Sequence, residues 1–177
     1  MKSQTRFVFN AVHILIWIVF IGLCIRTGTL IFTLILNLFF DIGEIQEFLE
    51  DVTAESGKLY EYRKAHHYAM FSLIILYSAI HAYIAYLAVR IFRKLRLEKP
   101  FSEGVTALIS RMSYVALGTG ILALAAEGYT EWISRQGVDI SKNWNGGSFL
   151  LLAGIIFILA EVFRRGTELQ YENELTV

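Results

Sequence analysis

The sequence has one cysteine and one proline among its 177 residues, and its sixteen basic residues are balanced by sixteen acidic ones. A single cysteine rules out an intramolecular disulfide and any metal site built from several cysteines. The zero net charge argues against a basic surface for nucleic acid, so we expect no direct contact with DNA or RNA. The sequence also lacks a Ser-His-Asp array, a Cys-His pair, a glycine-rich phosphate loop and a zinc-ligand spacing. We therefore predict neither an enzyme nor a bound cofactor.

Apolar residues, in contrast, make up 55% of the chain. Three stretches of 18 to 25 residues carry no charge and are long enough to cross a hydrocarbon core of roughly 30 Å: residues 7–25, 65–89 and 143–160. A fourth, 104–126, contains only Arg111, which lies close enough to its start to reach the headgroups. We predict a single all-α integral membrane domain over residues 1–177, with transmembrane helices at about 7–25, 66–92, 104–126 and 148–163.

Lysine and arginine are divided unevenly between the two sides of these helices. Ten of the sixteen fall on the side that holds both chain ends and the link between the second and third helices. The other side has longer connections but only six. Because short loops rich in Lys and Arg stay in the cytoplasm, we predict that both termini are cytoplasmic.

The connection between the first two helices has two parts. Residues 30–40 are apolar but follow an Arg-Thr-Gly-Thr break, so we expect them to project from the membrane or to lie at its surface. Residues 41–57 predict an amphipathic outer helix that ends near Gly57, with an apolar stripe of Ile42, Ile45, Phe48, Leu49 and Val52. We expect this helix to cover the projecting surface, forming an outer cap over about residues 30–64. A helix resting on lipid is the alternative.

The start of the third helix is marked by the sequence KPFSEG. Ser102 is expected to accept a hydrogen bond from a free N–H of the first turn, and Glu103 suits the positive end of the helix dipole. Further along, small residues recur at steps of three and four and predict a face for close packing of another helix: Ser113, Ala116, Gly120 and Ala123.

Ionisable residues inside the helices leave two alternative functions open. His67 and His81 lie 14 residues apart, and with His13 on another helix they allow one haem and an electron carrier. Packing and interfacial roles are the simpler explanation for these histidines. Arg26 and Glu127 could pair near the outer side, and His81 is the ionisable residue nearest the membrane centre. A small transport protein or an oligomeric pore is therefore the other alternative.

The link between the second and third helices is strongly basic. Each cation near the surface of an anionic membrane is worth about 1 kcal/mol. We predict that the basic residues of this region face lipid: Arg90, Arg93, Lys94, Arg96 and Lys99. The general preference for positive loops on the inner side explains them equally well.

The chain ends in EVFRRGTELQYENELTV. Glu161 can pair with Arg164 or Arg165 at helical spacing, and we expect this group to anchor the fourth helix at the inner surface. Gly166 permits a break or a bend, and the tail over residues 164–177 is too polar for lipid and too short to fold alone. We predict that a partner captures the tail in a groove or along a strand edge. The alternative is a tail that packs on the third helix or is solvated.

Two stretches, LRLEKPFSEGVTALISRMSYVALGTGIL and AEVFRRGTELQYENELTV, resemble a bacterial membrane family known as domain of unknown function 2975 (DUF2975). The family has a Pro-Phe-Ser-like turn before the third helix and a Phe-x-x-Gly-x-x-Leu-x-x-Glu-Asn-Asp/Glu-Leu-Thr-Val-like tail. Those positions are here Pro100, Phe101, Ser102, Phe163, Gly166, Leu169, Glu172, Asn173, Glu174, Leu175, Thr176 and Val177.

The resemblance implies a multi-pass protein of the bacterial inner membrane with no established activity. Members of the family are often encoded beside a small helix-turn-helix regulator, which implies a membrane partner or sensor for a cytoplasmic transcription factor. Membrane lipids and a second copy of the chain are the other partners that we consider. We predict partner contacts at Phe101, Ser102, Glu168, Leu169, Glu172, Asn173, Glu174, Leu175, Thr176 and Val177.

Overall fold

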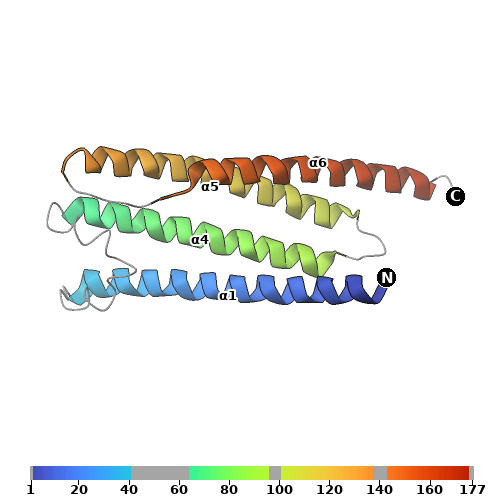
Figure 1. The fold of residues 1–177 in the computed structure, drawn as a ribbon, viewed down its shortest axis with the longest axis horizontal. Helices are drawn as coiled ribbons and strands as arrows, with labels where there is room; N and C mark the ends of the chain where they lie inside the picture. The colour runs from blue at the N-terminus through green and yellow to red at the C-terminus, as the bar shows by residue number, and fades with distance from the viewer. Residues whose placement is uncertain (1, 41–63, 96–100, 138–142, 176–177) are drawn as a thin grey trace.

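A computed structural model describes residues 2–40, 64–95, 101–137 and 143–175. Within these ranges the chain forms four helices: α1 (Lys2–Phe40), α4 (Lys64–Lys94), α5 (Glu103–Ser134) and α6 (Gly146–Leu175) (Figure 1). Each helix is long and apolar enough to cross a membrane. The predicted all-α protein with four candidate transmembrane helices is therefore confirmed.

The helices alternate in direction, so the molecule has two ends (Figure 1). The N-terminus, the end of α4, the start of α5 and the C-terminal end of α6 lie together at what we call the terminal end. The opposite end is called the far end. In the packing order, α6 contacts α5, α5 contacts α4, and α4 contacts α1. As a result α1 lies at one side of the molecule, with α4 as its main neighbour.

Helix α1 is continuous through the Arg-Thr-Gly-Thr sequence, so the break that we predicted there is wrong. Its 39 residues span about 58 Å, well beyond a hydrocarbon core of roughly 30 Å. The hydroxyls of Thr27, Thr29 and Thr33 bond to carbonyls four residues earlier in the same helix. Threonine in this stretch therefore satisfies its own hydroxyl without leaving the helix. The predicted amphipathic helix over residues 41–57 lies outside the described residues.

The start of α5 differs in one detail from the prediction. Ser102 has an extended backbone, with φ −136° and ψ 144°, but its hydroxyl makes no capping hydrogen bond. Its backbone carbonyl accepts the N–H groups of Val105 and Thr106 at 3.0 Å. The side-chain cap is thus wrong, while Glu103 does occupy the first turn.

The small-residue face of α5 is buried against α6. Ser113, Ala116, Gly120 and Ala123 are all buried. A Cβ atom on Gly120 would lie 2.7 Å from Cδ2 of Leu150 in α6. The prediction of a close packing face is therefore confirmed.

Two clusters of buried apolar residues hold the helices together. The far-end cluster joins α1, α4, α5 and the segment just before α6 through Leu30, Met70, Phe71, Ile74, Ala123, Ala126, Ile133 and Trp144. The second lies between α5 and α6 and runs toward the terminal end through Val105, Ile109, Ala116, Ala153, Ile156 and Ala160.

Candidate functional site

At the terminal end, the two sequence segments expected to contact a partner meet each other. The ring centroid of Phe101, which precedes α5, lies 5.3 Å from that of Phe163 in α6. A Cβ atom on Gly166 would lie 2.5 Å from Cδ1 of Phe101. Only glycine therefore lets the ring lie against the α6 backbone at this point.

Gly166 serves this close approach, since α6 continues to Leu175 without a break. At the next residue of α6, the hydroxyl of Thr167 is hydrogen-bonded to that of Thr106 at 3.1 Å. The sequence permits a break or a bend at Gly166, and the structure shows no break there. Capture of the tail by a partner stays a prediction, in which residues 167–175 start from a helix. The alternative, in which this part of the tail packs on the third predicted helix, holds at Gly166 and Thr167.

Beyond this contact, one side of α6 is open to the surroundings. Glu168, Leu169, Tyr171 and Glu172 are exposed, Leu169 by 60% and Tyr171 by 64%. Between this part of α6 and the start of α5 lies a hollow of about 370 Å³, which we call the terminal groove. It is lined by Glu103, Thr106, Ala107, Arg164, Thr167, Glu168 and Tyr171.

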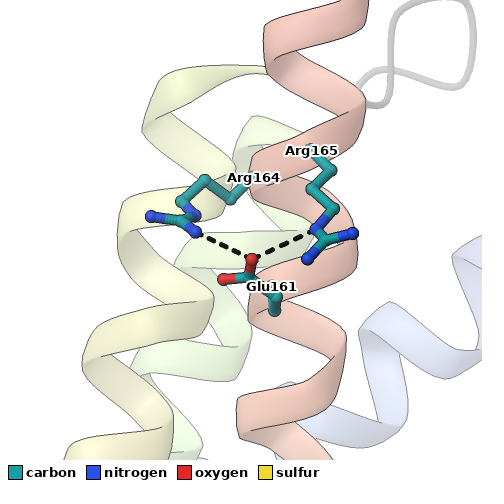
Figure 2. Close-up of polar contacts among 3 residues, drawn as sticks. All are labelled: Glu161, Arg164 and Arg165. Carbon is teal, nitrogen blue, oxygen red and sulfur yellow. Dashed lines mark hydrogen bonds and ion pairs between the residues drawn. The ribbon is translucent and has the colours of Figure 1, made fainter.

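Both predicted ion pairs of Glu161 are present (Figure 2). Its Oε1 atom accepts hydrogen bonds from Nη2 of Arg164 at 2.7 Å and from Nε of Arg165 at 3.2 Å. Arg164 reaches toward α5, whereas Arg165 lies on the other side of Glu161. Arg164 lines the terminal groove and also a neighbouring hollow of about 310 Å³ deeper between α5 and α6. Because the arginines are largely exposed, the pairs orient side chains more than they stabilise the fold.

Some of the basic residues before α5 contact other residues of the same molecule. The Arg90 guanidinium lies 5.7 Å from the ring centroid of Tyr86 on the same helix. Arg93 and Lys94 occupy the last turn of α4, where cations suit the helix dipole. The side chain of Lys94 passes over Gly104, at which a Cβ atom would lie 3.4 Å from the Lys94 Nζ. Arg96 and Lys99 lie outside the described residues, and the contact of this group with lipid stays a prediction.

The remaining predicted partner contacts divide into two groups. Phe101 and Ser102 are half-buried, and Phe101 contacts α6 within the molecule. Helix α6 includes Asn173, Glu174 and Leu175, but their side chains lie outside the described part of the chain, as do Thr176 and Val177. Glu168 and Leu169, together with Glu172, are therefore the predicted contact residues that the structure places on an open surface.

The structure separates the histidines that we considered as haem ligands. His13 accepts a hydrogen bond from Trp17 at 3.1 Å and stacks on Phe92 of α4. His81 lies eleven residues from Phe92, or about 16 Å along the helix, and bonds to the Tyr77 carbonyl. His67 is buried beside Phe71.

Among the described residues, no three or more His, Cys, Asp or Glu side chains come together. Arg26 and Glu127, both described residues, form no ion pair, and Glu127 accepts the N–H of Gly146 at 3.1 Å.

A family model described as "Protein of unknown function (DUF2975)" matches residues 51–177. The chain belongs to this family. The match includes α4, α5 and α6, and so both segments that meet at Phe101 and Gly166. No curated protein and no solved structure matches the chain. The resemblance stated from the sequence is thus confirmed, and it extends further toward the N-terminus than the motifs that carried it.

Sequence reasoning missed several groups of this DUF2975 site. Thr106, Arg164, Thr167 and Tyr171 line the terminal groove but were not predicted to contact a partner. A signal was available in α6, because Phe163, Gly166 and Thr167 follow at steps of three and one and share one helix face. The matching position on α5 is only visible once the two helices are paired.

Proposed function

We propose that this DUF2975 protein is a non-enzymatic, multi-pass protein of the bacterial inner membrane that holds a cytoplasmic regulator at its terminal end. The observation that carries the proposal is the contact of Phe101 with Phe163 and Gly166. This contact joins the two family motifs into one surface. A rigid surface binds more tightly than a disordered tail of the same sequence, because less conformational entropy is lost on binding.

The chemistry of the exposed α6 face indicates what kind of partner fits. Glu168 and Glu172 supply negative charge, while Leu169 and Tyr171 supply apolar and aromatic anchors. Aromatic anchors commonly carry much of the energy of an interface, and opposite charges guide the encounter. A partner with a basic face and a small apolar pocket is complementary to this surface.

A small helix-turn-helix regulator, which the family resemblance implies as a neighbour, has such a basic face where it contacts DNA phosphates. Docking of that face on α6 would compete with DNA. The membrane protein would then act by keeping the regulator away from its operator. The large number of Lys and Arg residues at the terminal end supports a cytoplasmic position for this surface.

The direct test is the affinity of the purified regulator for the full-length chain in lipid nanodiscs. Glu168→Lys and Leu169→Ala are each expected to weaken binding about tenfold or more, because one reverses the charge and the other removes an anchor. Glu131→Lys and Leu151→Ala are the matched controls, since both residues are exposed but lie away from the terminal groove. Equal affinity of all four variants would overturn the proposal.

Operator DNA adds a second readout. We expect excess operator DNA to release the regulator from the wild-type nanodisc, while unrelated DNA at the same concentration releases less. A ternary complex of chain, regulator and operator DNA would contradict the competitive arrangement.

Deletion of residues 168–177 separates this proposal from the transport alternative. Docking predicts that the shortened chain loses the regulator but keeps the melting temperature of its helix bundle. A transport protein whose helices are the working part would keep its activity after the same deletion.

A further inference from the structure

A separate hollow lies toward the far end of the molecule, away from the terminal groove. Its volume is about 330 Å³, and it is lined by side chains of α1, α4 and residues 143–149. This volume is at the lower end of the range for small-molecule pockets. Arg26, His81 and Asn145 are among its polar lining residues, and none of them belongs to the surface proposed to hold the regulator.

Arg26 is the charged residue of this hollow. It is the only Asp, Glu, Lys or Arg between residues 7 and 36, within the most apolar part of α1. Among the described residues, Arg26 has no ion-pair or hydrogen-bond partner. None of the described residues that line the hollow is acidic. The Arg26 side chain is exposed, and a guanidinium within an apolar span is stabilised by an anionic partner. The hollow therefore has a positive charge that none of its described lining residues neutralises.

The position of Arg26 is fixed by its neighbour in the sequence. The hydroxyl of Thr27 bonds to Ser78 of α4 at 2.8 Å, in a buried contact between the two helices. The same hydroxyl also bonds to the Leu23 carbonyl of its own helix at 2.8 Å. These bonds set the register of α1 against α4 at this level.

Hydrogen bonds also fix the opposite wall of the hollow, around Tyr77, Trp144 and Asn145. The Tyr77 hydroxyl donates a hydrogen bond to the Trp144 carbonyl, and the Trp144 indole donates to Thr130 at 3.1 Å. Asn145 has a positive φ of 53°, a conformation that asparagine tolerates better than most residues. Its backbone N–H is held by the side-chain oxygen of Asn143 at 2.9 Å. Among the described residues, the Asn143 amide nitrogen and the Asn145 side chain have no hydrogen-bond partner, so both can serve a ligand.

An aromatic wall completes the hollow. The Phe149 ring lies edge-on to the rings of His81 and Tyr77, with centroid distances of 4.7 Å and 5.9 Å. Because the Nδ1 atom of His81 donates to the Tyr77 carbonyl at 2.7 Å, its Nε2 atom is left for another partner. Ile74 adds an aliphatic contact.

We propose that this hollow binds a small monocarboxylate with an apolar or aromatic body. The planar guanidinium of Arg26 matches a carboxylate with two parallel hydrogen bonds. The asparagine amides supply further donors, and the body of the ligand lies against Phe149 and Ile74. A single arginine balances one negative charge, so the lining favours a carboxylate over a doubly charged phosphate. The carboxylate could come from a dissolved acid or from a fatty acid of the membrane.

Calorimetry on the full-length chain in nanodiscs tests the proposal with benzoate, laurate and the neutral benzamide as probes. We expect benzoate to bind and benzamide to bind at least about tenfold more weakly, because hydrogen bonds to charged groups are the strong ones. Arg26→Gln is expected to weaken benzoate binding about tenfold or more, with Arg26→Lys in between. Arg135→Gln, a change of an exposed arginine toward the far end, is expected to leave the affinity unchanged.

Three results would overturn the proposal: no binding of benzoate or laurate, equal affinity for benzoate and benzamide, or equal benzoate affinity of wild type and Arg26→Gln. Binding of laurate without benzoate, and with the same dependence on Arg26, supports the carboxylate site and assigns its ligand to the membrane. If Arg26→Gln does not fold, the comparison of benzoate with benzamide on the wild-type chain still decides the question.

Discussion

Some glycines on α5 and α6 are in tight contact with the facing helix or its flanking residues, whereas the glycines on α1 have no close neighbour. Cβ atoms on Gly120 and Gly146 would collide with leucines of the facing helix, at 2.7 and 2.9 Å. Gly22 and Gly28 of α1 have no such atom within 4 Å. Glycine thus brings the backbones of α5 and α6 close together, and it does not do so between α1 and α4.

The α5–α6 pair and the α1–α4 pair also differ in how far their apolar side chains are buried. Most apolar residues of α1 are exposed, and its most apolar stretch has no buried residue, against 39% of the corresponding stretch of α5. The contact of α1 with α4 includes the ring contact of Phe9 with Phe92 and the Thr27–Ser78 bond. The match to DUF2975 begins at residue 51, after α1 has ended. Helix α1 thus packs beside α4, keeps most of its apolar surface exposed and precedes the region that the family model matches.

The largest effect is expected from filling the contact between α5 and α6. Gly120→Val places new atoms against the Leu150 side chain and its backbone N, which lies 3.1 Å from the position of a Cβ. Overpacking of this kind costs about 1–3 kcal/mol. Gly118→Val is the control, because nothing lies within 4 Å of that position. Equal melting temperatures of the two variants in detergent would break the comparison.

A smaller loss is expected at the junction of the two motifs. Gly166→Ala displaces the Phe101 ring, which can turn aside more easily than a backbone atom, so we expect a loss of about 1 kcal/mol. Gly154→Ala on the same helix has open space and serves as the control.

A double-mutant cycle sharpens this prediction. Phe101→Ala removes the ring that collides with the new methyl group. The penalty of Gly166→Ala should therefore shrink in the Phe101→Ala background. Additive losses of melting temperature would show that the two residues do not contact each other.

Thr27→Val tests the contact of α1 with α4. It removes a buried interhelical hydrogen bond to Ser78, and such bonds in membranes average about 0.6 kcal/mol. Thr29→Val removes only a bond within α1 and is exposed, so it should change stability less. The measurement is chemical unfolding of both variants, and a larger loss for Thr29→Val would contradict the assigned register.

Glu161→Gln is expected to have the smallest effect. The carboxylate is partly exposed and both arginines are largely exposed, so solvent screens the pairs in Figure 2. We expect a melting temperature indistinguishable from that of wild type at 0.5 M salt or so, where such pairs are screened further. A clear loss that persists at high salt would show that this group holds α6 in place.

Much of the fold was predictable, because a helix is indicated by residues that are close together in the sequence. Three uncharged stretches and one with a single arginine predicted the four helices, and Ser113, Ala116, Gly120 and Ala123 predicted a buried packing face on α5. The Arg26–Thr29 stretch was misread as a break, since its glycine and threonines are also typical of loops. Threonine hydroxyls bonded to the same helix explain why the stretch stays helical.

The site was less predictable because it depends on contacts between distant residues. Gly166 was read as a breakpoint, although a glycine that permits a break and one that permits a close approach look alike in a sequence. The difference lies in Phe101, which is 65 positions away. The terminal groove and the hollow at Arg26 likewise require the helices to be paired first.

The meeting of Phe101 with Gly166 is the central claim, and disulfide trapping tests it most directly. A Cβ atom at position 166 would lie 2.9 Å from the Phe101 Cγ, which is one bond from the Phe101 Cβ, so two cysteines there are within reach of each other. In a Cys24→Ser background, Phe101→Cys/Gly166→Cys should form an intramolecular disulfide in native membranes much faster than Phe101→Cys/Gly154→Cys. Equal rates for the two pairs, or only cross-links between chains, would contradict the account.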